Sequence, residues 1–210
     1  MSVDLGALVR RFGSAVRERF GGWLPDDVEK ALRASSSCRT AELGGQLYVC
    51  EECGVVQPRY NSCRNRHCPQ CQGLARLEGL EARLDDLLPV PYYHLVFTLP
   101  SELQSWARQE PRGIYALLFR SAWSSFRDLA RDPRYLGGQV GMLAVLHTWG
   151  QQLQLHPHVH CVAPGCARSE SGGWMRASAR FLVPVKALSA GFRGRFLAGL
   201  DRQVRRGEWK

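Results

Sequence analysis

The sequence predicts an α+β protein with two parts, a helical and zinc-binding domain over residues 1–88 and an antiparallel-sheet domain over residues 89–210. Three observations support this class. Six of the eight cysteines fall between residues 38 and 71, in a segment with little apolar content. Three segments rich in aromatic and β-branched residues occur in the second part. Stretches with helical apolar spacing stand before, between and after them. We therefore expect helices packed against a partial antiparallel sheet.

Composition and charge narrow the class of protein. Of the 210 residues, 45% are apolar and 22% are charged, which excludes disordered and fibrous proteins. The net charge is +9, and residues 90–210 carry 16 basic and 7 acidic side chains, which points to a polyanionic partner. Polar and turn residues break the longest uncharged run, so we expect no membrane span. Without an apolar signal core near Asp4 we expect a cytoplasmic protein, whose clustered thiols bind metal.

Three helical segments are predicted in the first domain. Apolar residues at helical spacing indicate a helix in the first twenty residues, Gly21 and Gly22 break it, and Asp26 caps a second helix that ends near residue 35. A third amphipathic helix is stopped by Pro89 and Pro91. Its apolar positions are Leu74, Leu77, Leu80, Leu84, Leu87 and Leu88.

The second domain alternates strands and helices. Residues 92–99 read as a strand, since they are aromatic and β-branched and lie between prolines. Residues 101–131 read as helical, with an interruption near Pro111. Residues 140–149 and 156–163 are two further strands, and the polar residues between them suit an antiparallel hairpin. Residues 185–206 return to helix.

The cysteine block contains two C-x-x-C pairs, Cys50/Cys53 and Cys68/Cys71. Fourteen residues separate the pairs, a spacing typical of zinc ribbons. Each pair lies on a tight turn that aims two sulfurs at one point, so two turns supply four tetrahedral ligands. Because the segment buries little, we expect a structural Zn²⁺ to stabilise it.

The ligand set of this zinc site stays open. Cys50, Cys53, Cys68 and Cys71 are the simplest set, but Cys63 or His67 can displace one of them, and Cys38 can join a second, less regular site. A redox-active C-x-x-C is disfavoured, since such a site needs one pair beside a βαβ unit.

Three histidines alternate along the last predicted strand. His156, His158 and His160 share one face, while Val159 and Cys161 take the other. Imidazoles two positions apart lie about 6.5–7 Å from each other along the strand, close enough to converge on one divalent ion. A single histidine in a strand is usually a hydrogen-bonded core residue, but three within five positions favour metal binding.

The residues around His158 and His160 distinguish between the known classes of metal site that use an H-x-H motif. A metallo-β-lactamase continues with Asp and His, and an amidohydrolase needs downstream ligands, yet no histidine follows His160. A nuclease with one ion on a central strand fits. There the ion, Mg²⁺ or Mn²⁺, polarises the scissile phosphate. His147, on the neighbouring strand, is the first candidate for a third ligand, with His156 and Gln152 as alternatives. His94 is either a second-sphere residue or a core residue.

The motifs together resemble a known family. The segments CRNRHCPQCQ, YYHLVFTLP and LHTWGQQLQLHPHVHCVAPG, in this order, are similar to transposases of the insertion sequence 91 type, from about Cys38 to Leu200. The resemblance implies an N-terminal zinc-binding domain, an RRM-like HUH single-strand endonuclease domain, and rolling-circle-like transposition. It places the zinc on the two C-x-x-C pairs and the second ion on His158 and His160.

The family's nucleophilic tyrosines follow the histidine motif, and here no tyrosine follows His160. We therefore expect a truncated chain that binds DNA and metal but forms no phosphotyrosine bond alone. Tyr92 or Tyr93 is the alternative nucleophile, since relaxases place theirs N-terminally. The glycine-rich turn typical of the family is also altered, because Cys166 follows Gly165.

The expected partner is DNA, single-stranded at the element ends. The candidate phosphate contacts are arginines near the second C-x-x-C pair and on the last helix, namely Arg64, Arg66, Arg193, Arg195, Arg202, Arg205 and Arg206. A non-catalytic, zinc-dependent DNA-binding fragment is the alternative. A hydrolase of small molecules would leave the zinc module and the charge unexplained.

Overall fold

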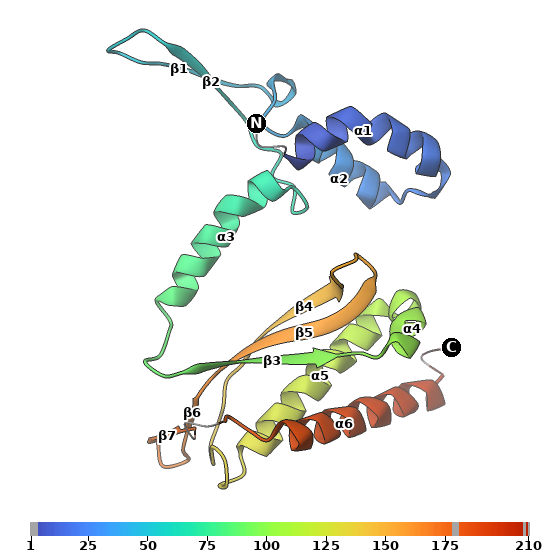
Figure 1. Ribbon diagram of the computed structural model, residues 1–210, viewed down its shortest axis with the longest axis vertical. Helices are drawn as coiled ribbons and strands as arrows, with labels where there is room; N and C mark the ends of the chain where they lie inside the picture. Colours follow the sequence, from blue (N-terminus) through green and yellow to red (C-terminus); the bar gives the residue numbers. More distant parts are fainter. Residues whose placement is uncertain (1–3, 178–180, 208, 210) are drawn as a thin grey trace. The chain divides into compact units, whose positions relative to one another are not determined.

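Figure 1 shows the computed structural model of the protein, which describes residues 4–177, 181–207 and 209. The chain divides into two compact units, Met1–Leu87 and Leu88–Lys210, and each is described by itself. The predicted α+β class is confirmed, since the first unit combines helices with a small hairpin and the second combines helices with an antiparallel sheet.

Two helices that pack together begin the first unit (Figure 1). Asp4 caps the first helix, because its side chain accepts a hydrogen bond of 2.7 Å from the backbone N–H of Ala7. The prediction that Asp26 caps the second helix was wrong. Pro25 occupies the N-cap, and Asp26 is the first helical residue. At that position the negative charge of Asp26 still interacts favourably with the helix dipole. The elements are α1 (Leu5–Phe20), η1 (Gly21–Trp23) and α2 (Asp26–Ser37).

An exposed hairpin and a helix complete the first unit. The hairpin pairs Gly45 with Tyr60 at its base and Val49 with Val56 near its tip, and every one of its strand residues is exposed. The third helix begins earlier than the leucine pattern indicated, because Pro69 is well suited to the first helical position. The elements are η2 (Ala41–Leu43), β1 (Gly45–Val49), β2 (Val56–Tyr60) and α3 (Pro69–Leu84).

The second unit is built on a three-stranded antiparallel sheet in the order β3-β5-β4, and the three predicted strands are confirmed. The predicted helices also form, with the expected interruption before Pro111. Along the described residues we find no helix both long and apolar enough to traverse a bilayer. The elements are β3 (Tyr92–Thr98), η3 (Ser101–Leu103), α4 (Gln104–Gln109), α5 (Pro111–Ala130), β4 (Leu143–Trp149), β5 (Leu155–Pro164), β6 (Cys166–Arg168), β7 (Trp174–Arg176) and α6 (Val185–Arg205).

The helices of the second unit lie on one face of this sheet (Figure 1). Val159, Cys161 and Ala163 of β5 are fully buried, in one core cluster with Phe126 of α5 and Phe196 of α6. The alternate residues of β5, including His158 and His160, therefore point to the opposite face. We call this second side the open face of the sheet. His158 and His160 lie on the central strand, which is hydrogen-bonded to a neighbouring strand on each edge.

The central strand contains a proline between its first two histidines. Pro157 lies just beyond the last regular pair between β3 and β5, Thr98 with His158. It also lies beside an irregularity in the pairing of β5 with β4, between His147 and Trp149. The missing N–H of Pro157 therefore breaks no regular ladder hydrogen bond.

Candidate metal centres

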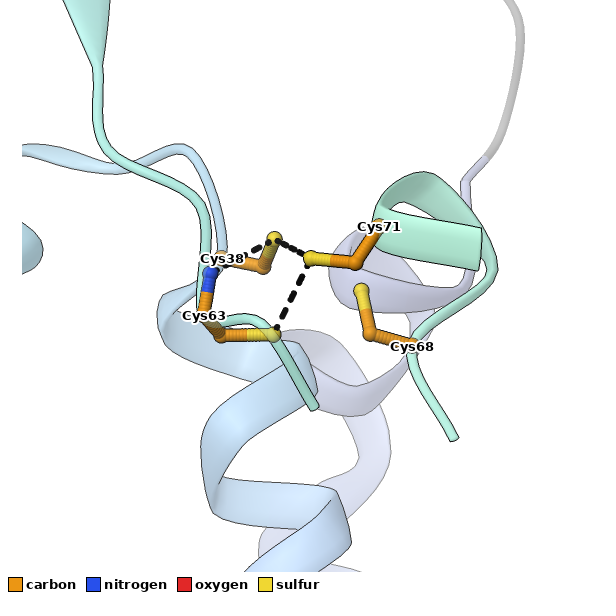
Figure 2. A group of neighbouring side chains, drawn as sticks. All are labelled: Cys38, Cys63, Cys68 and Cys71. Atoms are coloured by element: carbon orange, nitrogen blue, oxygen red, sulfur yellow. Dashed lines mark hydrogen bonds between the residues drawn. The ribbon is translucent and has the colours of Figure 1, made fainter. Parts of the chain in front are cut away.

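Four cysteines from separate segments of the first unit converge on one point (Figure 2). Cys38 directly follows α2, Cys63 lies in the loop after β2, Cys68 is the N-cap of α3, and Cys71 lies in the first turn of that helix. The backbone N–H of Arg39 donates to the carbonyl of Asn61 at 3.1 Å, which joins the first two segments at the base of the hairpin. We call these residues the four-thiol cluster.

The distances in the four-thiol cluster suit a tetrahedral metal ion. Its sulfur atoms all lie within 4.8 Å of one another, and Cys71 Sγ is 3.5 Å from both Cys38 Sγ and Cys63 Sγ. Zn–S bonds of about 2.3 Å give a tetrahedron with sulfur–sulfur edges of about 3.8 Å. The four thiols therefore fit a structural Zn²⁺ with little rearrangement.

The pKa values in the cluster show how the thiols share protons. Burial raises the pKa of Cys38 to about 12 and raises the pKa of Cys63 as well. Burial also acts on Cys71, but hydrogen bonds from Cys63 and Cys38 outweigh it and hold the pKa of Cys71 at about 7. Among Cys38, Cys63 and Cys71, Cys71 therefore loses its proton most readily, and a bound Zn²⁺ would displace the protons of the thiols that hold it.

The ligand set that the spacing indicated differs from this cluster. Cys50 and Cys53 are exposed and occupy a turn at the hairpin tip, where Gly54 has a φ of 69° and its N–H donates to the Cys50 carbonyl at 2.9 Å. The five-residue strands carry that turn about 16 Å from the hairpin base. Cys38 and Cys63, which lie at the base of the hairpin, form the cluster with Cys68 and Cys71 instead of Cys50 and Cys53.

His67 also lies outside the four-thiol cluster. Its Nε2 is 3.2 Å from Arg66 Nε, and the residue lines a shallow cavity with Leu5 and Val9 of α1. Arg64 and Arg66, the candidate phosphate contacts of this loop, are both exposed.

The second candidate centre is a group of imidazoles on the open face of the sheet. His147 of β4 pairs with His158 of β5, and together with His160 they offer nitrogen atoms that all lie within 4.8 Å of one another. Three nitrogens that bind one ion at about 2.1 Å lie about 3–4 Å apart, so small side-chain rotations complete the site. We call these residues the three-histidine group.

Hydrogen bonds orient two of these rings. His158 Nδ1 lies 2.6 Å from the carbonyl oxygen of His156, to which it donates. His160 Nδ1 lies 2.8 Å from Nε2 of His94, whose ring stacks on that of His160 with an interplanar angle of 6°. Both Nε2 atoms are left for an ion. His94 therefore lies beside the three-histidine group and contacts one of its members.

Burial lowers the pKa of His160, and the neighbouring His147, His158 and His94 lower it further. The neighbouring rings lower this pKa because a proton on His160 would be repelled by protons on the other rings. His160 therefore favours the neutral imidazole, which is the form that binds metals.

We expect His94→Ala to weaken Mn²⁺ binding about 10- to 100-fold, because the ring that fixes the orientation of His160 is lost. Titration of Mn²⁺ followed by electron paramagnetic resonance measures the change. Thr98→Ala is the matched control, since Thr98 lies on the same face of β3 and pairs with His158. Equal loss in both variants would contradict an orienting role for His94.

A cavity of about 680 Å³ adjoins the three-histidine group. The tip of the β4–β5 hairpin supplies Gln151, Gln152 and Gln154 to its lining, and His156 lines it as well. The indole of Trp149 is 58% exposed and lies parallel to the ring of His147, with centroids 6.3 Å apart. The site thus combines metal ligands, amides and an exposed aromatic ring.

The candidate arginines of the last helix divide into two sets. Arg195, Arg202 and Arg206 line a groove between α5 and α6. Arg193 and Arg205 do not line it, and Arg205 forms an ion pair of 2.8 Å with Asp201. The sequence analysis missed two further arginines of this groove, Arg120 and Arg127 of α5. Their seven-residue spacing, which Arg195 and Arg202 share, was the available signal.

Comparison with known proteins agrees with these two centres. Residues 8–99 match the family model described as "Transposase zinc-binding domain", and residues 141–210 match the one described as "Putative transposase". The first match contains the four-thiol cluster and the second contains the three-histidine group. The organisation is that of a transposase.

Curated relatives point to the same family. "Putative transposase y4qJ" of Sinorhizobium fredii is 44% identical over 95% of this chain and 50% of its own length. The transposase for insertion sequence element IS801 of Pseudomonas savastanoi pv. phaseolicola is 31% identical over 75% of this chain and 38% of its own length. This chain belongs to the insertion sequence 91 family of transposases. It spans about half the length, or less, of these relatives.

Solved structures with a similar arrangement include the conjugative relaxase TrwC in complex with oriT DNA. Its metal-bound structure has a TM-score of 0.42 and 14% identity over 52% of this chain and 42% of its own. The metal-free structure has a TM-score of 0.43 and 16% identity, over 52% of this chain and 43% of the relaxase chain.

Proposed function

We propose that this chain carries the DNA- and metal-binding parts of a rolling-circle transposase, and that its second unit holds single-stranded DNA at a histidine-bound divalent ion. The observation that carries the proposal is the three-histidine group on the open face of a central strand, beside a cavity of about 680 Å³. The four-thiol cluster supports the first unit as a structural Zn²⁺ site.

The side chains of the histidine site would bind one divalent ion. His147, His158 and His160 would hold Mg²⁺ or Mn²⁺, which acts when bound as a Lewis acid on a nonbridging phosphate oxygen. The hydrogen bonds from Nδ1 of His158 and His160 direct their Nε2 atoms toward the ion. The rigid central strand thus fixes where the scissile phosphate lies.

The remainder of the cavity suits an unpaired strand. The three glutamine amides at the hairpin tip can donate to phosphates or base edges. The exposed ring of Trp149 offers a stacking surface, and a base is free to stack on it only when it has left the duplex. The exposed indole therefore favours single-stranded over double-stranded DNA.

We propose that the nucleophile does not come from the tyrosines of this unit. Tyr93, Tyr115 and Tyr135 pack against the hydrophobic core. Tyr92 lies on the open face, but it pairs with Pro164, four residues along β5 from His160 and so about 13 Å away. The second unit would then bind DNA without forming a phosphotyrosine through one of its own tyrosines.

Binding and cleavage assays on one labelled oligonucleotide test the proposal. We expect the chain to bind a single strand more tightly than the matching duplex, with tighter binding in Mn²⁺ than in EDTA, and to yield no covalent adduct on a denaturing gel. Equal binding of strand and duplex, or no effect of Mn²⁺, would contradict the proposed site. A labelled adduct would show that a tyrosine of this chain does act.

We expect Trp149→Ala to weaken binding of a single strand about 5- to 160-fold, because one base–indole stack contributes about 1–3 kcal/mol. Fluorescence anisotropy with a labelled oligonucleotide measures the change, and Trp149→Phe should restore most of it. Trp174→Ala is the control, since Trp174 is similarly exposed but lies on β7, away from the histidine cavity. An equal effect of both substitutions would contradict stacking at Trp149.

A further inference from the structure

A groove of about 530 Å³ runs between α5 and α6 and concentrates basic side chains. Five guanidinium groups line it, two from α5 and three from α6, together with the hydroxyls of Ser121 and Ser124. The five are Arg120, Arg127, Arg195, Arg202 and Arg206.

The two walls of the groove are helices that pack against each other. Gly199 of α6 lies so close to Leu117 of α5 that a Cβ at residue 199 would clash with the leucine side chain. On α6 the arginines run from Arg195 to Arg206, about 16 Å at 1.5 Å per residue. The positive charge is thus spread along a line, as a linear polyanion requires.

The five arginines of the groove differ in how far neighbouring carboxylates offset their charge. Asp128 is the one carboxylate among the residues that line the groove, and it lies 2.8 Å from Arg127 and 2.9 Å from Arg195. Over the described part of the chain, no carboxylate forms an ion pair with Arg120 or Arg202. These two guanidinium groups are exposed and available to an anion from outside.

The groove and the histidine site lie on opposite sides of the sheet. α5 and α6 contribute to the core that covers Val159 and Cys161, whereas His158 and His160 belong to the open face. A DNA strand at the ion therefore leaves the groove unoccupied. None of the described side chains that line the groove is aromatic, and its guanidinium and hydroxyl donors suit phosphates.

We propose that this groove binds the phosphodiester backbone of a second DNA segment, separate from the strand at the three-histidine group. The inference rests on the proposed function, which it extends from one bound strand to two. Recognition is through charge along the backbone and is independent of base sequence. One unit can thereby hold two stretches of DNA at once.

Paired charge substitutions test the groove. Arg120→Gln with Arg202→Gln removes one guanidinium from each wall. Arg112→Gln with Lys186→Gln is the matched control, since it removes one exposed basic side chain from each of the same helices outside the groove. Anisotropy titrations with a 10-nucleotide single strand in Mn²⁺ give the stoichiometry and the salt dependence of binding.

We expect two oligonucleotides per chain for the wild type and the control, and one for the groove variant. The groove variant should also lower the salt slope of log K by about 1.4, from two lost phosphate contacts on a single strand. His158→Ala with His160→Ala should instead keep the groove-bound oligonucleotide.

One oligonucleotide per wild-type chain, lost only in the histidine variant, would overturn the second site and leave the proposed function intact. Equal losses in the groove and control variants would also overturn it. If the wild type bound no DNA at all, the proposed function itself would fail.

Discussion

Cys68→Ser should release the zinc from the protein and unfold the first unit. Zinc binding contributes on the order of 10–16 kcal/mol in small finger peptides, and the hairpin and α3 of this unit bury little apolar surface of their own. We expect the zinc content of the purified full chain, measured by mass spectrometry of the metal, to fall at least about fivefold. Amide hydrogen exchange should show loss of protection in the first unit.

Cys53→Ser is the matched control for this change. It makes the same substitution at an exposed thiol outside the four-thiol cluster, so zinc content and protection should stay close to those of the wild type. Equal zinc loss in both variants would restore the ligand set that the C-x-x-C spacing indicated. Retention of zinc by Cys68→Ser would contradict the cluster itself.

His158→Ala with His160→Ala should abolish divalent binding in the second unit. Two of the three nitrogen ligands are removed, so we expect Mn²⁺ affinity to fall by more than the roughly 100-fold that loss of an outer-shell partner alone can cause. The stability of the unit should change little, because both rings lie on the open face and outside the core cluster. Mn²⁺ titration and thermal unfolding separate the two effects.

His156→Ala serves as the control for the histidine pair. His156 lines the same cavity but is outside the three-histidine group, so its removal should leave most of the Mn²⁺ affinity. If His156→Ala reduced the affinity as strongly as the double variant, His156 would be a ligand and His147 would lose its assignment. A double variant that kept Mn²⁺ would contradict the site.

The sheet of the second unit could be predicted from sequence because its signals are local. The segment at Tyr92–Thr98 is aromatic, β-branched and bounded by prolines, and the alternation at His156, His158 and His160 gives the face of each side chain. The polar residues before β5 also indicated the hairpin with β4. That pairing is what brings His147 beside His158.

The thiol ligands were harder to predict because spacing does not say where a hairpin points. The C-x-x-C at Cys50 was assigned to the metal, yet the strands on either side of it carry it to an exposed tip. Leu47, Val49 and Val56 around the Gly54 turn were a usable strand signal. The groove was missed for a similar reason, since sequence does not show which faces of α5 and α6 meet.

The proline between the first two histidines has a consequence for how this site is assembled. Because side chains alternate, sliding β5 by one residue against its neighbours would send both imidazoles into hydrocarbon and bring Val159 and Cys161 to the ion's side. Pro157 disfavours such misalignment, since elsewhere in the ladder its ring would leave a carbonyl without a donor. A single codon gained or lost within β5 would therefore erase the site while leaving the composition of the strand almost unaltered.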